Sequence, residues 1–292
     1  MSTQKVSRYP GIRAFEQEEE FLFFGRRREA RSLLAQVKAQ SLVVLFAKSG
    51  IGKSSLLNAG LIPLLDNGLY QPVKIRFQDT SVRPVDMAKL ALAPYLDEER
   101  LLKNAKTSKE KAGFWEFLRA CHFGSSTIPV IIFDQFEEFF EHERPAREAF
   151  ILEMADLLSE RLPNRIREQL RAIPFMDRTE EQLAWFSPIP MKAIFAIRSD
   201  RISLLDDLST EIPSILNNRF HLRPLRREQA QEAIEEPAQI EGPEFLTPPF
   251  GYEPLLLNEI LDYLSNKDEE IESFQLQLIC QHIEKQIRER YG

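Results

Sequence analysis

The eight residues AKSGIGKS at positions 47–54 have the spacing of a phosphate-binding loop. Backbone N–H groups wrap phosphate oxygens in such a loop, so small residues are needed where the backbone approaches closely, and Gly50 and Gly52 meet this need. Lys53 is expected to reach the β- and γ-phosphates, and Ser54 to place its hydroxyl on Mg²⁺. Ala47 stands where the pattern usually has glycine, and its methyl group costs little if φ is negative. We predict a nucleotide site with these loop residues: Ser49, Gly50, Ile51, Gly52, Lys53, Ser54 and Ser55.

A second group of polar residues follows the apolar run IPVIIF at 128–133. Asp134 comes directly after this run, which predicts a buried strand, and ligands of open α/β sheets bind at the carboxyl ends of strands. A carboxylate there can hold Mg²⁺ directly or through water. Glu137 and Glu138 lie within the next turn, where one of them can polarise an attacking water molecule. The alternative for these glutamates is a solvated helix face.

Arg198 follows a further apolar run, MKAIFAI at 191–197, which predicts a strand beside the strand of the phosphate loop. An arginine at this edge of the sheet can sense or stabilise a γ-phosphate. The alternative is a strand-end salt bridge to Asp200 or Asp206. We count Arg198 as a catalytic candidate together with Lys53 and the three carboxylates.

The composition bounds the kind of protein. The chain has 292 residues, 43% of them hydrophobic, and two cysteines. The cysteines form no metal or disulfide pattern, which suits a reducing cytoplasm. No apolar run approaches the ~20 residues needed to cross a bilayer. The net charge of -7 argues against nucleic-acid binding by the whole surface.

The elements that must position these residues follow from the apolar pattern. Strands are expected at 41–46, 72–77, 128–133, 191–197 and 219–225, with helices between them at 27–38, from Lys53 onward, within 84–120 and on both sides of Pro145. Residues 160–190 are expected to form a helical excursion. This alternation predicts an α/β fold, a P-loop NTPase with a parallel sheet covered by helices on both faces.

The pattern changes after Leu225, where a helix ending around Pro237 and two later helices indicate a small all-helical domain. We therefore divide the chain into an N-terminal loop (1–40), a P-loop core (41–225) and a helical domain (226–292).

Together, these motifs resemble the STAND NTPases, in particular the bacterial novel-STAND branch. The segment YPGIRAFEQEEEFLFFGRRREARSLL resembles that branch's entry motif at Phe24, Gly25, Arg26 and Glu29, although Arg27 stands where the family commonly has glutamate. Five further segments resemble family motifs in the family's order: AKSGIGKSSLLNAGLIPLL, IIFDQFEEFF, AIRSD, LRPLRREQAQEAIEEPA and LQLICQHIE.

The resemblance implies a cytoplasmic molecular switch that binds ATP or ADP with Mg²⁺ and hydrolyses ATP slowly. ADP would favour a closed monomer and ATP an open form that self-associates. It places Phe24, Gly25 and Arg26 at the adenine pocket, which makes 1–40 an N-terminal loop with an adenine-side motif, and Pro237 would approach from the helical side. Because the family carries further domains, the resemblance also implies that the helical domain (226–292) is truncated. It also implies partners in the form of sensor and effector domains or a triggering protein, and a setting in bacterial conflict or antiphage signalling.

Two alternatives stay open at the level of sequence. One is a DNA-engaged AAA+-type ATPase of the initiator or loader kind, which shares the loop, the acidic strand end and the strand-end arginine. The other is an ADP-bound scaffold that never turns over and acts through partner binding.

Overall fold

A computed structural model describes residues 5–65, 68–105, 111–124 and 126–291 of the chain. The chain divides into two compact units. The first comprises Met1–Ala35, Phe46–Leu65 and His221–Gly292, and the second comprises Gln36–Leu45 and Asp66–Phe220. These units combine segments that are distant in sequence, whereas the predicted domains at 1–40, 41–225 and 226–292 follow chain order. The predicted domain division stays a prediction.

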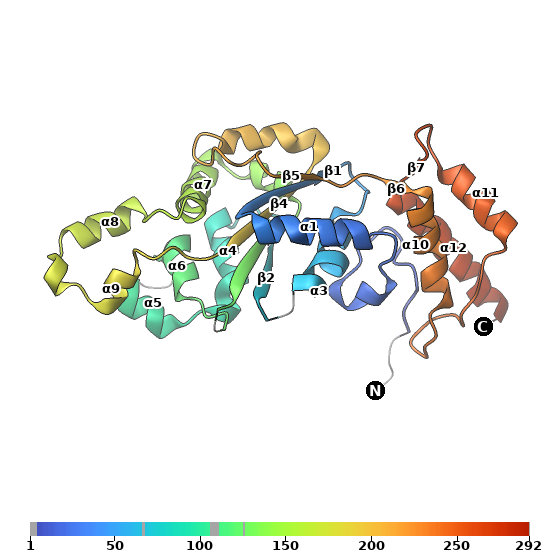
Figure 1. Cartoon of the computed structure of the whole chain (residues 1–292), viewed down its shortest axis with the longest axis horizontal. Helices are drawn as coiled ribbons and strands as arrows, with labels where there is room; N and C mark the ends of the chain where they lie inside the picture. Colours follow the sequence, from blue (N-terminus) through green and yellow to red (C-terminus); the bar gives the residue numbers. More distant parts are fainter. Residues whose placement is uncertain (1–4, 66–67, 106–110, 125, 292) are drawn as a thin grey trace. The chain divides into compact units, whose positions relative to one another are not determined.

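A five-stranded sheet has the strand order β2-β3-β4-β1-β5 (Figure 1). Its strands are β1 (Leu42–Ala47), β2 (Tyr70–Ile75), β3 (Ile128–Phe133), β4 (Lys192–Arg198) and β5 (Arg219–His221). β3 pairs in parallel with both β2 and β4. Inside the second unit, Ala193 N–H donates to Ser41 O at 2.8 Å and Val44 N–H donates to Asn218 O at 2.9 Å, as expected for β1 between β4 and β5.

The strands form where the sequence is apolar throughout. Every residue of β3 after the first is buried, and so are five consecutive residues of β4, because both faces of these inner strands are covered. Phenylalanines that meet ring to ring extend this core beyond the strand ends: Phe77, Phe133, Phe136, Phe139, Phe150 and Phe195. The predicted α/β class with a parallel sheet is confirmed. The strand expected at 72–77 begins two residues earlier, at Tyr70.

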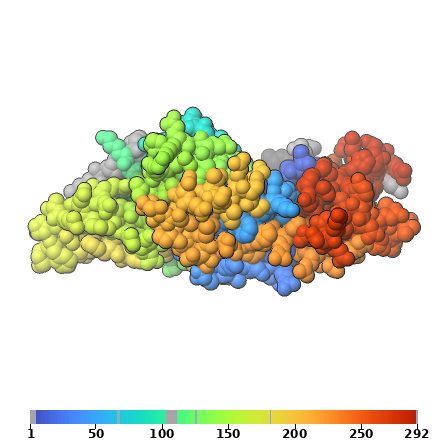
Figure 2. Space-filling model, turned by 90° about the horizontal axis from the view of Figure 1, so that it is seen from above, coloured from blue at the N-terminus to red at the C-terminus, as the bar shows by residue number. Residues whose placement is uncertain are grey.

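The helices of the second unit are α4 (Pro84–Leu92), η3 (Ala93–Tyr95), α5 (Glu98–Ala105), α6 (Phe114–Ala120), η4 (Phe136–Glu141), α7 (Arg144–Leu158), α8 (Asn164–Arg171), η5 (Phe175–Asp177), α9 (Glu180–Ala184) and η6 (Ser199–Leu208). The expected helical excursion over 160–190 is therefore present, and Figure 2 shows it as a yellow-green and yellow mass. Of the helical stretch expected within 84–120, residues 106–110 lie outside the described residues.

Pro145 does not divide the helical region that contains it. η4 ends at Glu141 and α7 begins at Arg144, so Pro145 lies in the first turn of α7. Proline is well tolerated there because the N–H it lacks has no intrahelical partner anyway.

The first unit contains α1 (Arg27–Ala39, whose last four residues lie in the second unit), η1 (Gln17–Leu22), α2 (Lys53–Ser55), η2 (Leu56–Leu61), α3 (Ile62–Leu65), α10 (Arg227–Gln239), α11 (Pro254–Leu264) and α12 (Ser273–Tyr291). The antiparallel strands β6 (Leu225–Arg226) and β7 (Glu270–Ile271) join them. A shared core of buried side chains holds α10, α11 and α12 together, including Ile234, Leu261, Leu276 and Cys280.

One expectation is wrong in detail. The strand expected at 219–225 is two strands, because Pro224 has no N–H to continue a ladder and Leu225 pairs instead with the distant Ile271. The helix expected to end around Pro237 ends two residues later, at Gln239. The helix after Lys53 is present but includes a π-helical stretch, η2, all six residues of which are buried.

Candidate functional site

The phosphate loop lies in the first unit between β1 and α2. Ala47 ends β1 fully buried and is not among the non-glycine residues with positive φ, so its methyl group is accommodated without backbone strain. Gly50 and Gly52 have φ values of +79° and +98°, a region that side chains disfavour. Lys53 begins α2, and its Nζ donates to Ala47 O at 3.4 Å, so the side chain folds back over the loop.

The first residues of α12 cover this loop. Ile51, 1% exposed, accepts hydrogen bonds at its carbonyl from Ser273 Oγ at 3.0 Å and from Arg26 Nη2 at 3.3 Å. A Cβ added at Gly50 would lie 2.8 Å from Cδ1 of Phe274. The backbone of the loop is therefore held by side chains from two segments far from it in sequence.

Arg26 is the centre of these contacts. Its side chain is nearly fully buried and donates to the carbonyl of Arg223 at 2.8 Å, in addition to Ile51 O and Ser273 Oγ. An ion pair with Glu29 at 3.4 Å balances part of its charge. Burial lowers the pKa of the guanidinium, and Glu29 partly offsets that shift. The residue predicted at the adenine side thus ties the entry segment, the phosphate loop and α12 together.

Gly25 explains why the entry motif needs a glycine. Its φ is +78°, and an added Cβ would lie 2.3 Å from the carbonyl oxygen of Gln229 in α10. Gln229 in turn donates from Nε2 to Glu29 at 2.7 Å. Phe24 lies beneath the guanidinium of Arg27, whose Cζ is 5.1 Å from the ring centroid. The entry motif and α10 therefore pack backbone against backbone.

Pro237 is linked to a residue that sequence reasoning did not single out. Arg8 is fully buried and donates to the carbonyls of Pro237 at 2.8 Å, Ile240 at 2.7 Å and Thr247 at 3.0 Å. Glu284 faces it, and the guanidinium lies 4.0 Å from the centroid of the Phe245 ring. No local pattern marks Arg8, because its partners come from the end of α10 and the chain after it.

The serines of the loop differ in their surroundings. Ser49 is exposed, whereas Ser54 and Ser55 are half-buried. Ser55 Oγ accepts a hydrogen bond from the backbone N–H of Phe15 at 3.2 Å, which joins α2 to the entry segment. Ser54, in the first turn of α2, is the hydroxyl that the motif assigns to the metal.

The acidic group lies in the second unit, at the carboxyl end of β3. Asp134 is 2% exposed, and its Oδ2 is 3.0 Å from the ammonium of Lys74 on β2. The next residue, Gln135, has a φ of +54°, and its side-chain oxygen accepts a hydrogen bond from Arg76 Nη2. The chain turns sharply here, which brings the following glutamates back to the strand ends.

The two glutamates have different partners. Glu138 Oε1 is 2.5 Å from Arg76 Nη2, and its other oxygen, Oε2, is buried. Glu137 Oε2 accepts the backbone N–H of Arg198 at 3.3 Å. Phe136 and Phe139, on either side of them in the chain, are fully buried, and their rings stack in the core.

Arg198 makes the strand-end salt bridge that was the alternative to a phosphate contact. Its Nη2 is 2.8 Å from Asp200 Oδ2, and both side chains are well exposed. The hydrogen bond from Arg198 lowers the pKa of the Asp200 carboxyl. The guanidinium is thus held at the carboxyl end of β4 by a partner that water can replace.

The oxygen donors suit Mg²⁺ more than a transition metal. Among the described residues, no group of three or more histidine, cysteine, aspartate or glutamate side chains could hold a metal ion by itself. Mg²⁺ needs fewer protein ligands, because it is usually bound through one or two carboxylates together with substrate phosphates. Asp134 fits this role, since its buried carboxylate already faces a cation in the form of Lys74.

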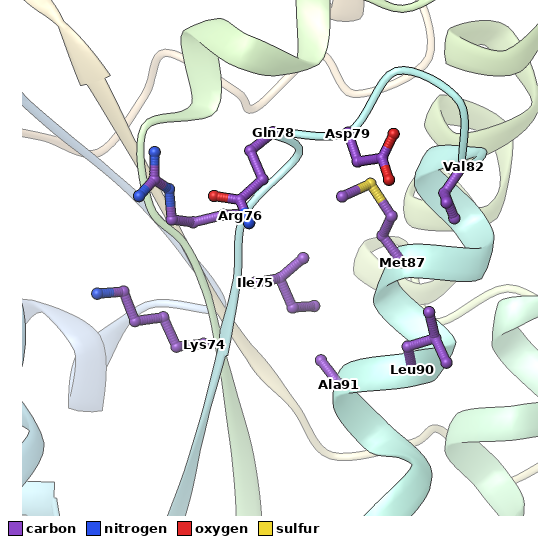
Figure 3. Close-up of a pocket in the computed structure, with 9 residues that line it drawn as sticks. All are labelled: Lys74, Ile75, Arg76, Gln78, Asp79, Val82, Met87, Leu90 and Ala91. Carbon is purple, nitrogen blue, oxygen red and sulfur yellow. The ribbon is translucent and has the colours of Figure 1, made fainter.

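Lys74 and Arg76 are further residues of this group, and the motifs of the sequence do not point to them. Both also border a cavity of about 490 Å³ between the end of β2 and α4 (Figure 3). Their alternation in PVKIRF is a signal that could have placed them on one face of a strand. Their acidic partners could not be named without the strand order.

The comparisons with known proteins concern the family and the fold of the chain. Residues 9–269 match the family model described as Novel STAND NTPase 1. Among solved structures, the chain is similar to the Walker-type ATPase PABY2304 of Pyrococcus abyssi, with 13% identity, 95% of this chain and 72% of that chain covered, and a TM-score of 0.54. It is also similar to the ORC2 protein of Aeropyrum pernix in its ADP form, with 13% identity, 92% and 62% coverage and a TM-score of 0.49.

At such identities, the structural likeness shows the fold alone. No curated protein sequence matches the chain. In the part of the chain that the structure describes, no helix is both long enough and apolar enough to span a bilayer. The family match covers the entry motif, the phosphate loop, the acidic strand end and the helices α10 and α11, and the chain belongs to the Novel STAND NTPase 1 family of P-loop NTPases.

Proposed function

We propose that this NTPase is a Mg²⁺-dependent switch that binds ATP or ADP and hydrolyses ATP slowly. Lys53 and the backbone N–H groups of residues 49–55 hold the phosphates, and Ser54 and Asp134 hold Mg²⁺. Arg198 reads the γ-phosphate by leaving Asp200, an exposed partner that costs little to exchange. Mg²⁺ would neutralise phosphate charge when bound.

Glu137 is the better candidate for orienting the attacking water. Glu138 has one oxygen committed to Arg76 and the other buried away from solvent. Glu137, in η4, accepts the backbone N–H of Arg198 at the end of β4 through its Oε2. Its remaining lone pairs are available to a water molecule.

One observation carries the proposal of a switch. Ile51, inside the phosphate loop, accepts hydrogen bonds from both Arg26 and Ser273, and Phe274 lies against Gly50. A nucleotide that moves this loop therefore changes the contacts of α12 directly. A switch needs such contacts to differ between two states, since a ligand shifts an equilibrium only by its differential affinity.

The same contacts support the proposed site of the base. Phe24, Gly25 and Arg26 lie in the segment that packs on α10, and Pro237 lies in the last turn of that helix. We infer that adenine binds near these residues, on the resemblance to the family. ADP would favour the closed contacts of α12, and ATP an open form that self-associates and signals to sensor and effector domains in bacterial defence.

The test is nucleotide binding and phosphate release by wild type and by Lys53→Ala. Wild type is expected to bind ATP and ADP with Mg²⁺, and the variant to lose at least tenfold in affinity. Hydrogen exchange should then show different protection of the segment around Ser273 with ADP and with ATP. Wild type that binds neither nucleotide would overturn the proposal.

Two other outcomes would redirect it. ADP retained through purification, with no phosphate released from added ATP, would identify an ADP-bound scaffold. Hydrolysis that DNA stimulates at low salt, and that is lost at higher salt, would favour a DNA-engaged ATPase.

A further inference from the structure

Two cations lie on one face of the sheet at the end of β2: Lys74 in the strand and Arg76 directly after its last residue. β2 is an edge strand in the order β2-β3-β4-β1-β5. Lys74 and Arg76 are two residues apart and so point to the same side, while Ile75 points to the other, as Figure 3 shows. In the pairing with β3, Ile75 lies opposite Phe133, and Asp134 N–H donates to Ile75 O at 3.0 Å. The acidic residues that follow β3 are therefore brought beside these cations by the strand pairing itself.

The two cations are held differently. Arg76 Nη2 contacts both Gln135 and Glu138, and a planar guanidinium with two acceptors is firmly placed. Lys74 pairs with Asp134 at 3.0 Å through its ammonium, a compact charge on a flexible stem. The Lys74 side chain is 31% exposed, whereas Asp134 is 2% exposed. The lysine can therefore turn its ammonium toward solvent, and the aspartate cannot leave.

A carboxylate as buried as Asp134 needs a positive partner, because an uncompensated buried charge is strongly destabilising. Lys74 meets this need in the structure, and a divalent cation bound by Asp134 would meet it equally. An ammonium 3.0 Å from the carboxylate repels a second cation that approaches the same oxygens. Ammonium and metal are thus alternatives at one carboxylate.

We propose that Lys74 is a positioning residue that sets the metal affinity of the site by acting as the resident counter-cation of Asp134. When Mg²⁺ is bound at Asp134, the ammonium would swing into solvent on its partly exposed stem. Arg76 stays on Glu138 during this exchange. The inference rests on the proposed function, because it assumes that Asp134 takes part in Mg²⁺ binding.

The test measures metal binding and does not depend on turnover. Mn²⁺, a paramagnetic stand-in for Mg²⁺, is titrated into the full chain with saturating ADP, and free Mn²⁺ is followed by electron paramagnetic resonance. Lys74→Met, which keeps most of the stem and removes the charge, is expected to bind Mn²⁺ roughly tenfold more tightly than wild type, a change of about 1.4 kcal/mol. Lys74→Arg, which keeps the charge, should stay within about threefold of wild type or bind more weakly.

A matched control is available on the same sheet. Lys192 begins β4, and its ammonium donates to the backbone carbonyls of Lys38 and Gln40 at 3.1 and 3.0 Å. Lys192→Met removes a partly buried lysine from the opposite end of a strand without touching a carboxylate. Its Mn²⁺ affinity should equal that of wild type, so a general effect of lost positive charge would be detected here.

The outcomes separate this inference from the proposed function. If wild type and Lys74→Met both bind ADP and have the same Mn²⁺ affinity, the role of Lys74 is wrong while the proposed function stands. Weaker Mn²⁺ binding by Lys74→Met would have the same meaning. Wild type that binds neither ADP nor Mn²⁺ would overturn both proposals. Circular dichroism checks that Lys74→Met is folded, and Lys74→Gln serves as a second uncharged variant, expected to show the same tightening.

Discussion

Replacing Arg26 by alanine tests whether the entry motif is structural as well as nucleotide-binding. The guanidinium donates to two backbone carbonyls, those of Arg223 and Ile51, and to Ser273 Oγ. Ser273 Oγ keeps its own hydrogen bond to Ile51 O at 3.0 Å when the arginine is lost. The carbonyl of Arg223 loses a charged donor outright, and that of Ile51 loses one of two.

The magnitude follows from these contacts. A hydrogen bond from a charged group contributes about 1.5–3 kcal/mol, and a buried acceptor left unsatisfied costs about 1–3 kcal/mol. Removing a nearly buried guanidinium also removes its own desolvation cost, which favours the low end of these ranges. We expect Arg26→Ala to lower the free energy of unfolding by about 3 kcal/mol, taken as about 1.5 kcal/mol for each carbonyl.

The assay is urea unfolding followed by far-ultraviolet circular dichroism, with Arg28→Ala as the control. Arg28 is exposed and lies two residues away in α1, so its loss is expected to change stability by less than about 0.5 kcal/mol. Hydrogen exchange of the peptides that contain Ile51 and Ser273 should be faster in Arg26→Ala than in Arg28→Ala. Equal unfolding midpoints and equal exchange in the two variants would refute the reasoning, because the contacts of Arg26 would then contribute nothing.

Two further predictions concern the glycine loop and the thiols. Gly50→Ala and Gly68→Ala both place a side chain at a φ of about +80°. The new Cβ at Gly50 would lie 2.8 Å from Phe274, whereas no described atom lies within 4 Å of a Cβ at Gly68. Gly68→Ala should lower the free energy of unfolding by about 1 kcal/mol and leave nucleotide binding unchanged. Gly50→Ala should in addition weaken ADP binding at least tenfold in a binding titration. Equal effects of the two variants would show that Phe274 moves away from the new Cβ without cost. Burial raises the pKa of the Cys121 and Cys280 thiols to about 12 each, so both stay protonated at pH 8. Ellman's reagent should therefore label no thiol in minutes in native protein and two in urea, and rapid native labelling would contradict the burial.

Much of the fold could be predicted because the inner strands are apolar on both faces. β3 was placed to the residue, and β1 and β4 within one residue, since a strand covered on both sides leaves a continuous apolar run. β5 and β6 could not be separated in the same way. β6 exists because Leu225 pairs with Ile271, a partner 46 positions later in the chain, and no local pattern contains that information.

The candidate site was predictable where its chemistry is local. The spacing of Gly50, Gly52 and Lys53 follows from how a loop wraps a phosphate, so the sequence alone indicates it. Burial of Arg26 beside the exposed Arg27 was not predictable, because Arg26 precedes the helix that begins at Arg27 and no helical period applies to it. The composition of FFGRRREAR favours a helix face exposed to solvent. Arg26 is buried nonetheless, because its tertiary contacts outweigh this preference.

The consecutive glutamates show why the sheet order decides what local sequence leaves open. In the sequence, Glu137 and Glu138 follow Asp134 by three and four residues, and nothing local distinguishes their roles. In the fold, β2 reaches Glu138 through Arg76, and β4 reaches Glu137 through the backbone N–H of Arg198. The strand order therefore gives the two carboxylates different surroundings: one is fixed by a guanidinium with its second oxygen buried, and the other lies beside the residue proposed to read the γ-phosphate. The backbone N–H of Arg198 belongs to the end of a buried strand, so it stays in place when the Arg198 side chain leaves Asp200 for a γ-phosphate. Arg198 can then couple the two proposed roles: its backbone holds Glu137, which orients the water, and its side chain contacts the γ-phosphate.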